Sequence, residues 1–212
     1  SVFGQAGKLM RLDCRSREFE YFPFDPKGYQ LVLVNSKVKH ELVGSPYNDR
    51  RRSCENVVAA IAAQFPDRHF ETLRDAEWTD LEAIRNKVSE EDYSRAHYVL
   101  GEKARVLAVC EALNQGDYET VGQKMYETHD GLSNEYDVSC EELDFLNDVA
   151  RECGVTGSRI MGGGFGGCTI NLVKEERYDH FVEEVTKRFA AKYGHAPEVY
   201  PVVISDGSHK VC

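Results

Sequence analysis

The sequence predicts an α+β fold, because stretches with the pattern of strands and stretches with the pattern of helices occupy separate parts of the chain. Short β-like runs come first, and a long central region has apolar residues at helical spacing. The C-terminal part returns to β-like runs around a glycine-rich loop, followed by one amphipathic helix. The length of 212 residues is sufficient for one large domain, or a domain and a half, with a substantial core.

Composition and charge limit the classes of function. Hydrophobic residues make up 42% of the chain and charged residues 29%, which is ordinary for a globular protein. The formal net charge of -10 argues against nucleic acid or an anionic membrane as the main partner. Arg50, Arg51 and Arg52 form the one basic run, which could still bind a small anion. No membrane-spanning apolar run and no signal peptide is visible.

Seven cysteines are scattered through the sequence without a CxxC or Cys/His metal spacing. They predict free thiols in a reducing compartment rather than a disulfide framework or a zinc site. The cytoplasm is therefore the expected location, and no metal site is predicted in this chain. The sequence begins at Ser1, without Met, directly in folded-looking sequence, so we expect further sequence upstream.

The N-terminal third predicts strands and then a helix. Three β-like runs are expected, at residues 8–13, 18–24 and 30–34. The Asp-Pro-Lys-Gly sequence at residues 25–28 predicts a turn between the last two. Ser45 is the expected N-cap of a helix over residues 47–65, with Pro46 at the first helical position.

The middle of the chain predicts mainly helices. Residues 67–88 carry only a short helical stripe. A longer helix is expected over residues 92–113 and another up to about residue 132, with Gln-Gly-Asp at 115–117 ending one and capping the next. These two should form an antiparallel hairpin. Ser139 to Glu142 has the form of a capping box, which would open a further helix ending near Gly154.

The C-terminal part predicts a strand, a glycine loop, a second strand, a helix and a final strand. The expected strands are residues 158–161, 168–173 and 198–204. The helix is strongly amphipathic from Tyr178 onward and should end at Gly194. No internal repeat, low-complexity tract or linker is present.

The glycine loop places five glycines in the six positions Gly162 to Gly167, interrupted by Phe165. It contains GxGxxG, but the dinucleotide motif must join a strand to a helix, and a strand-like run follows here. A Walker loop is excluded as well, because no Lys-Ser or Lys-Thr follows the last glycine. Glycines are needed where φ is positive, or where a backbone or ligand leaves no room for a Cβ atom. Crowding by another loop and contact with a ligand both remain open.

Other polar residues have ordinary structural interpretations. By pattern alone Tyr47, in the first turn of its helix, is more typical of packing than of a ligand contact. Arg50 to Arg52 are typical of a solvated helix face. His40, His97 and His129 lie in no nucleophile or metal spacing, which favours surface or core polar roles. The esterase elbow, the zinc-protease motif and the EF-hand loop are absent from the sequence.

Several motifs together nevertheless resemble one family. MGGGFGGCTI is similar to the third conserved motif of the superfamily of galactokinase, homoserine kinase, mevalonate kinase and phosphomevalonate kinase (GHMP kinases), in its galactokinase form. Further agreement in order and spacing is found in LDCRS (12–16), SPYNDRRRSCE (45–55), HYVLGEKAR (97–105), YDVSCEELDFL (136–146) and the ending SDGSHKVC. The resemblance covers essentially the whole chain.

The resemblance implies the C-terminal lobe of a two-lobed kinase, with an antiparallel sheet packed with helices. Residues 1–40 would be strands that continue from the N-terminal lobe, and residues 41–212 would be the C-terminal domain. The galactokinase family uses ATP and Mg2+ to phosphorylate α-D-galactose at its anomeric hydroxyl. The implied partners are therefore galactose and ATP, with no nucleic acid and no membrane.

The resemblance also implies roles for particular residues. Tyr47 matches a tyrosine that hydrogen-bonds a galactose hydroxyl, and Lys39 matches a frequently arginine position near the catalytic acid. The positions that would support the nucleotide loop are Gly162, Gly163, Gly164, Phe165, Gly166 and Gly167. The family's phosphate-binding loop, magnesium carboxylate and catalytic aspartate have no counterpart here, and the aspartate would fall just before Ser1. We therefore expect no catalysis by this chain alone.

Two rival functions share this lobe. One is a galactose-sensing regulatory protein that binds sugar and ATP without turnover, and the other is a kinase for a related sugar such as N-acetylgalactosamine. The N-terminal strands would normally pack against the other lobe. Leu9, Phe19 and Phe22 are therefore expected to be exposed or buried in a dimer, and self-association of the chain follows from this.

Overall fold

The computed structural model describes residues 3–39 and 47–208. Strands β1 (Lys8–Leu12) and β2 (Phe19–Pro23) form an antiparallel hairpin. Strands β3 (Tyr29–Asn35), β4 (Gly157–Ile160), β5 (Cys168–Lys174) and β6 (Glu198–Val202) form an antiparallel sheet in the order β4-β5-β3-β6. The predicted α+β class is confirmed, and each predicted strand exists within two residues of its expected bounds.

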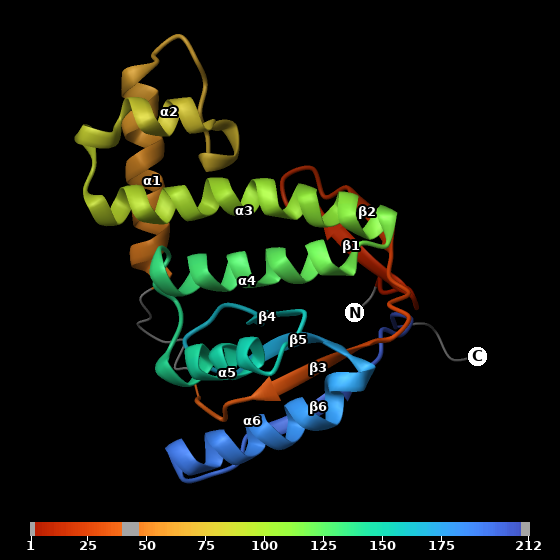
Figure 1. The fold of residues 1–212 in the computed structure, drawn as a ribbon. Helices are drawn as coiled ribbons and strands as arrows, with labels where there is room; N and C mark the ends of the chain where they lie inside the picture. The colour runs from red at the N-terminus through yellow and green to blue at the C-terminus, as the bar shows by residue number, and fades with distance from the viewer. Residues whose placement is uncertain (1–2, 40–46, 209–212) are drawn as a thin grey trace.

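Six α-helices complete the described part of the chain: α1 (Tyr47–Gln64), α2 (Trp78–Ala83), α3 (Glu90–Gln115), α4 (Tyr118–Asn134), α5 (Glu141–Glu152) and α6 (Tyr178–Tyr193). Short 3-10 turns occur at Leu73–Asp75, Arg85–Lys87 and Glu175–Arg177. Figure 1 shows α3 and α4 side by side above the sheet and α6 below it. None of the described helices is long and apolar enough to cross a membrane.

Both faces of the sheet are covered, because its strands place apolar side chains on one face and on the other. Val32 and Val34 of β3 are fully buried in a cluster with residues of α5 and α6, such as Leu146 and Phe181. The opposite face, with Leu172 of β5, packs against the β1–β2 hairpin and α3–α4. A third cluster joins α1, α2 and α3, away from the sheet.

Most helix ends follow the expected chemistry. Ser89 caps α3, its Oγ accepting from the Asp92 amide at 3.0 Å, so this helix begins two residues before the predicted start. Gly116, with φ of 69°, ends α3, and Asp117 caps α4 through the Thr120 amide at 3.0 Å. The predicted α3–α4 hairpin is confirmed. The expected cap at Ser45 and Pro46 lies outside the described residues.

The capping box predicted at Ser139 is wrong. Helix α5 begins at Glu141, so Cys140 is the N-cap residue and makes no side-chain cap hydrogen bond. The Ser139 hydroxyl instead donates to Asp144 Oδ1 at 2.6 Å. The serine hydroxyl thus binds a carboxylate one turn into the helix, and the N-cap position lies one residue later than predicted.

The hairpin is more closely packed on its own chain than the sequence predicts. Phe22 is 5% exposed, in a cluster with Cys110 and Leu113 of α3, so the expectation that it is exposed or dimer-buried is wrong. Leu9 packs partly against the same cluster. Phe19, at 46% exposure, does lie at the surface. Strands pleat with alternate side chains on opposite faces, so one face of the hairpin covers α3 and the other faces outward.

Candidate functional site

The glycine loop connects β4 to β5, as the sequence predicts. Gly162, Gly164, Gly166 and Gly167 have φ values of 81°, 87°, 138° and 82°, in the region that side chains other than glycine rarely adopt. Phe165 also has a positive φ of 58°. Its amide donates to the Val138 carbonyl at 2.6 Å, and this contact holds the loop against the segment before α5.

Neighbouring segments of the same chain crowd three of the glycines. A Cβ atom on Gly163 would collide with the Tyr47 hydroxyl, and one on Gly164 with the Val138 carbonyl oxygen. On Gly166 it would lie 2.8 Å from the carbonyl oxygen of Val38. Gly162 and Gly167 have open space at this position, so their requirement is the backbone conformation alone. Crowding by other loops therefore explains much of the glycine content.

Tyr47 begins α1 and faces the glycine loop. Its hydroxyl donates to the Gly163 carbonyl, and its ring meets the Phe165 ring edge-on at a centroid distance of 5.6 Å. Burial raises the pKa of Tyr47, against the opposing effect of the Arg50 charge, so the phenol stays protonated at neutral pH and can donate a hydrogen bond.

Arg50 lies one helical turn after Tyr47 and joins α1 to the same region. It is 5% exposed, donates from Nε to the Tyr136 carbonyl at 3.1 Å, and pairs with Asp137 Oδ2 at 2.6 Å. Its guanidinium lies 5.3 Å from the centre of the Phe165 ring. The prediction of a solvated face is therefore wrong for Arg50, because the first turn of α1 faces the loop before α5.

The other two arginines of the run behave as predicted. Arg51 and Arg52 have exposed side chains and pair with Glu55 and Asp49 on the same helix. The sequence did contain a signal that distinguishes Arg50 from Arg51 and Arg52. Residues three apart in a helix share a face, so Arg50 shares the face of Tyr47 while Arg51 and Arg52 point elsewhere.

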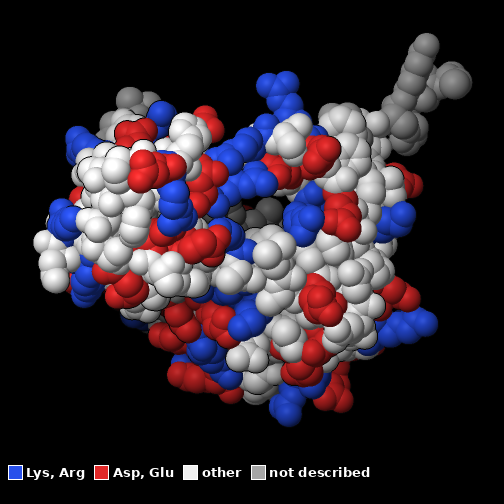
Figure 2. Space-filling model, turned by 90° about the horizontal axis from the view of Figure 1, so that it is seen from above, with Lys and Arg blue, Asp and Glu red and all other residues white. Residues whose placement is uncertain are grey.

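A pocket of about 660 Å³ opens beside Tyr47, Gly162 and Gly163. Its other walls are the end of β1, residues of α3 that include Tyr98, and the segment containing Val138. Figure 2 shows the molecule from above, with a hollow in this face and lysine and arginine side chains beside it. The positively charged lining residues are Arg11, Arg74 and Lys103. The carboxylates of Asp13 and Glu102 line it as well, so the pocket has apolar walls and a rim of both charges.

Two reciprocal ion pairs hold the β1–β2 turn at this pocket. Arg74 binds both carboxylate oxygens of Asp13, and Arg15 binds those of Asp75 at 2.7 and 3.0 Å. Hydrogen bonds from Arg74 hold the pKa of Asp13 well below its ordinary value, and those from Arg15 do the same for Asp75. We call these four residues the turn clamp. No sequence pattern predicts the turn clamp, because the partners lie about sixty positions apart.

The remaining candidates are not assembled at this pocket. Lys39 is exposed and makes no ion pair with a described residue, and His40 lies outside the described residues. His97 is at the surface, with Nδ1 at 2.5 Å from Glu135 Oε2, and His129 is buried with Nε2 at 3.3 Å from Asp144 Oδ1. Both histidines have the surface and core roles expected of them.

Comparison with known proteins shows what the chain is similar to. Residues 109–191 match the family model for GHMP kinases C terminal. The chain is 38% identical to the galactokinase of Homo sapiens over 213 residues, which cover 100% of this chain and 52% of that protein. It is 36% identical to the galactokinase of Thermotoga maritima, again over 100% of this chain and 57% of that protein.

This chain is related to the galactokinases among the GHMP kinases. A galactokinase of Lactococcus lactis, solved in complex with galactose, superposes with a TM-score of 0.90 at 26% identity, over 99% of this chain and 54% of that one. A mevalonate kinase of L. major, at 20% identity and a TM-score of 0.52, shares the fold. The chain spans about half the length of the curated relatives it matches.

Side chains that could ligate a metal ion are scattered in the described part of the chain. Within residues 3–39 and 47–208, no three His, Cys, Asp or Glu side chains lie close enough together to hold a metal ion. The pocket beside Tyr47 is lined mainly by apolar side chains, with the Tyr47 phenol, backbone groups of the glycine loop, and side chains of both charges. The phenol and the backbone groups can form hydrogen bonds to a ligand that carries hydroxyls.

Proposed function

We propose that the protein to which this chain belongs is a galactokinase, which transfers the γ-phosphoryl group of ATP to the anomeric hydroxyl of α-D-galactose. The observation that carries the proposal is the pocket in which Tyr47 meets Gly163. It occurs in a chain that matches galactokinases over its whole length and superposes on one solved with galactose. Fold alone would not support this function, since one fold hosts many.

In this proposal Tyr47 binds the sugar. A neutral phenol donates and accepts one hydrogen bond each, so Tyr47 can bridge a galactose hydroxyl and the Gly163 carbonyl. Phe165 packs edge-on against the tyrosine ring, and Arg50 lies over the Phe165 ring. These contacts therefore orient the sugar before reaction. Positioning of the reactants, together with charge stabilisation, provides most of the rate acceleration of phosphoryl transfer.

The glycine loop has a second proposed role as support for the nucleotide-binding loop. Gly162 and Gly167 leave open space where a side chain would be, so another segment can approach the loop at these two positions. ATP, Mg2+ and the catalytic acid are assigned to the part of the protein outside these 212 residues, and Lys39 to an accessory role near that acid. The proposed domain division is residues 1–40 and 41–212.

The test uses the full-length protein with ATP and galactose, and follows ADP release and sugar phosphate. We expect turnover with galactose that exceeds turnover with N-acetylgalactosamine. Galactose binding without turnover would favour the sensor protein, and preferential turnover of N-acetylgalactosamine would favour the related-sugar kinase. Either result would contradict the proposal.

A further inference from the structure

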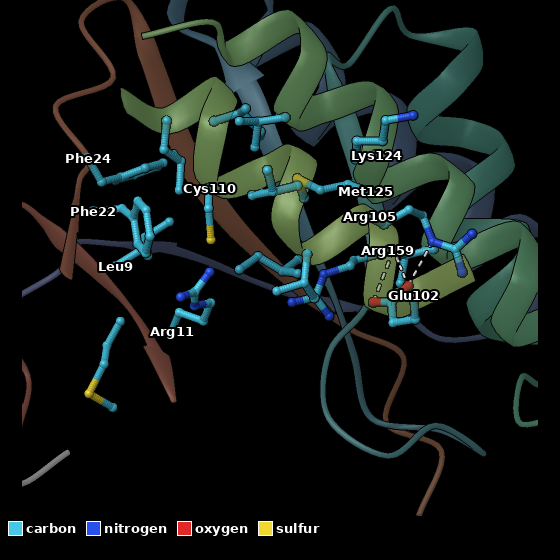
Figure 3. A pocket seen from close by; sticks show the side chains of 18 of the residues that line it. Leu9, Arg11, Phe22, Phe24, Glu102, Arg105, Cys110, Lys124, Met125 and Arg159 are labelled. Atoms are coloured by element: carbon cyan, nitrogen blue, oxygen red, sulfur yellow. Dashed lines mark hydrogen bonds and ion pairs between the residues drawn. The ribbon is translucent and has the colours of Figure 1, made fainter. Parts of the chain in front are cut away.

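A second cavity, of about 400 Å³, lies between the β1–β2 hairpin, helices α3 and α4, and the sheet. Most of its wall is apolar, with Leu9, Phe22 and Phe24 from the hairpin, Met125 from α4 and Leu172 from β5 (Figure 3). Neither Tyr47 nor the glycine loop lines it, although it adjoins the proposed sugar pocket, with which it shares Arg11, Glu102 and Val106. Such a cavity favours an occupant with an apolar body.

Four cationic side chains also line this cavity. Three have carboxylate partners: Arg11 with Glu20, Arg105 with Glu102, and Lys124 with Glu127, each at 2.8 Å. The fourth, Arg159, comes from β4. Figure 3 shows Arg159 and Arg11 on opposite sides of the same space.

Arg159 differs from the other three because no carboxylate of a described residue lies within 4.0 Å of it. Its one hydrogen bond to a described residue is from Nη1 to the Ile160 carbonyl at 2.8 Å. A guanidinium has five N–H donors, so most of its donors are available to a ligand. A partly buried cation beside apolar walls is costly to leave uncompensated, and an anion that binds it forms strong, charge-assisted hydrogen bonds.

We propose that this cavity binds a small organic monocarboxylate with an apolar body, such as an arylalkanoate, whose carboxylate pairs with Arg159. The apolar walls exclude a strongly hydrated ligand such as free phosphate or a sugar phosphate, which would lose its hydration without replacement. The single uncompensated cation matches a single negative charge. The proposal does not rest on the proposed galactokinase activity, because it uses neither Tyr47 nor the glycine loop.

The experiment titrates 3-phenylpropionate into the full-length protein and measures the heat of binding. The neutral analogue 3-phenylpropan-1-ol has the same apolar body and no charge, so it separates the two contributions. We expect saturable binding of the acid, weakened at least tenfold in Arg159→Gln, while binding of the alcohol is the same in both proteins. The matched control is Arg177→Gln, an exposed arginine without an ion pair to a described residue, which should bind the acid like the wild type.

Two further variants guard against loss of folding. Arg159→Lys keeps the positive charge and should retain most of the binding, whereas Val109→Phe fills the cavity and should abolish binding of both compounds. Thermal melting confirms that each variant is folded. Absence of saturable acid binding to the wild type, or equal acid affinity in folded Arg159→Gln, would overturn the proposal.

Discussion

At the scale of single residues, one hydroxyl connects the proposed sugar pocket to the glycine loop. Tyr47 donates to the Gly163 carbonyl, which is possible because Gly163 has no side chain to occupy that space. The resemblance to galactokinases alone could assign Tyr47 to a sugar. The structure adds a role for two neighbouring residues, since Phe165 packs against the tyrosine ring and Arg50 lies over the Phe165 ring.

Removal of the Tyr47 hydroxyl tests its role in binding. Tyr47→Phe should weaken galactose binding by about 1 kcal/mol, about fivefold in Kd, which is the usual scale of a neutral hydrogen bond. Calorimetric titration of the full-length protein measures it. Tyr200→Phe, at an exposed tyrosine of β6, is the matched control and should leave the affinity unchanged. Equal affinity in Tyr47→Phe and the wild type would remove Tyr47 from the site.

Substitution of Gly164 tests whether the glycine loop has a catalytic role or only a structural one. Gly164→Ala combines a φ of 87° with collision against the Val138 carbonyl, whereas Gly162→Ala has a similar φ of 81° and open space. The backbone strain, about 1 to 3 kcal/mol, is common to both. We expect Gly164→Ala to lower kcat/KM much more than Gly162→Ala. If Gly164→Ala lowered only the melting temperature while the kinetic constants held, the loop would be structural.

Arg50 should affect both stability and sugar binding. Arg50→Lys keeps the charge but cannot reach the Tyr136 and Asp137 groups with the same fork of donors, which should cost about 2 kcal/mol of unfolding free energy. Galactose affinity should fall as well, because Phe165 loses its neighbour. Denaturant unfolding and titration measure the two effects. Arg51→Lys on the exposed face serves as control, and an equal effect of both changes would contradict the role of Arg50.

At the scale of elements, the sequence pattern was sufficient for the regular segments. The strands and the long helices were predicted because apolar periodicity and turn residues specify them locally, as with Gly116 and Asp117 between α3 and α4. The cap of α5 was misplaced because Ser139 binds Asp144 in place of the expected backbone amide. For Arg50 the helical spacing from Tyr47 was a usable signal, but its partners Tyr136 and Asp137 lie far along the chain. The turn clamp and the burial of Phe22 also depend on contacts between segments far apart in the chain, and no local pattern contains that information.

The turn clamp should make stability depend on pH in acid. The pKa values of Asp13 and Asp75 are lowered in the folded chain, so their contribution is complete above the unfolded value of about 4. This contribution to stability is lost as the pH falls toward the pKa values that the two carboxyl groups have in the folded chain. The melting temperature of Asp13→Asn/Asp75→Asn should therefore be below that of the wild type at neutral pH, and the difference should narrow between about pH 5 and pH 2. Asp67→Asn, at an exposed position, is the control, and a difference independent of pH would contradict the clamp.

At the scale of the whole molecule, both faces of the four-stranded sheet are covered within the chain. Helices α5 and α6 cover one face, and the hairpin with α3 and α4 covers the other. Four of the ten exposed large apolar side chains in the described part of the chain lie on or beside the hairpin: Phe3, Met10, Leu12 and Phe19, at 58%, 40%, 49% and 46% exposure. Apolar residues gathered on one surface usually mark an interface.

Self-association of the isolated 212-residue chain is therefore predicted to occur through the hairpin. Phe19 stacks on Phe3 with ring centroids 5.4 Å apart, so the two rings present one continuous apolar surface. Sedimentation at increasing protein concentration should show a rising mass, and Leu12→Ser/Phe19→Ser should shift association to higher concentration. Val203→Ser, at an 89% exposed position just after β6, is the matched control and should have no effect. A monomer at all concentrations would contradict the prediction. It would show that the free energy gained by burying these few side chains does not exceed the entropic cost of combining two chains.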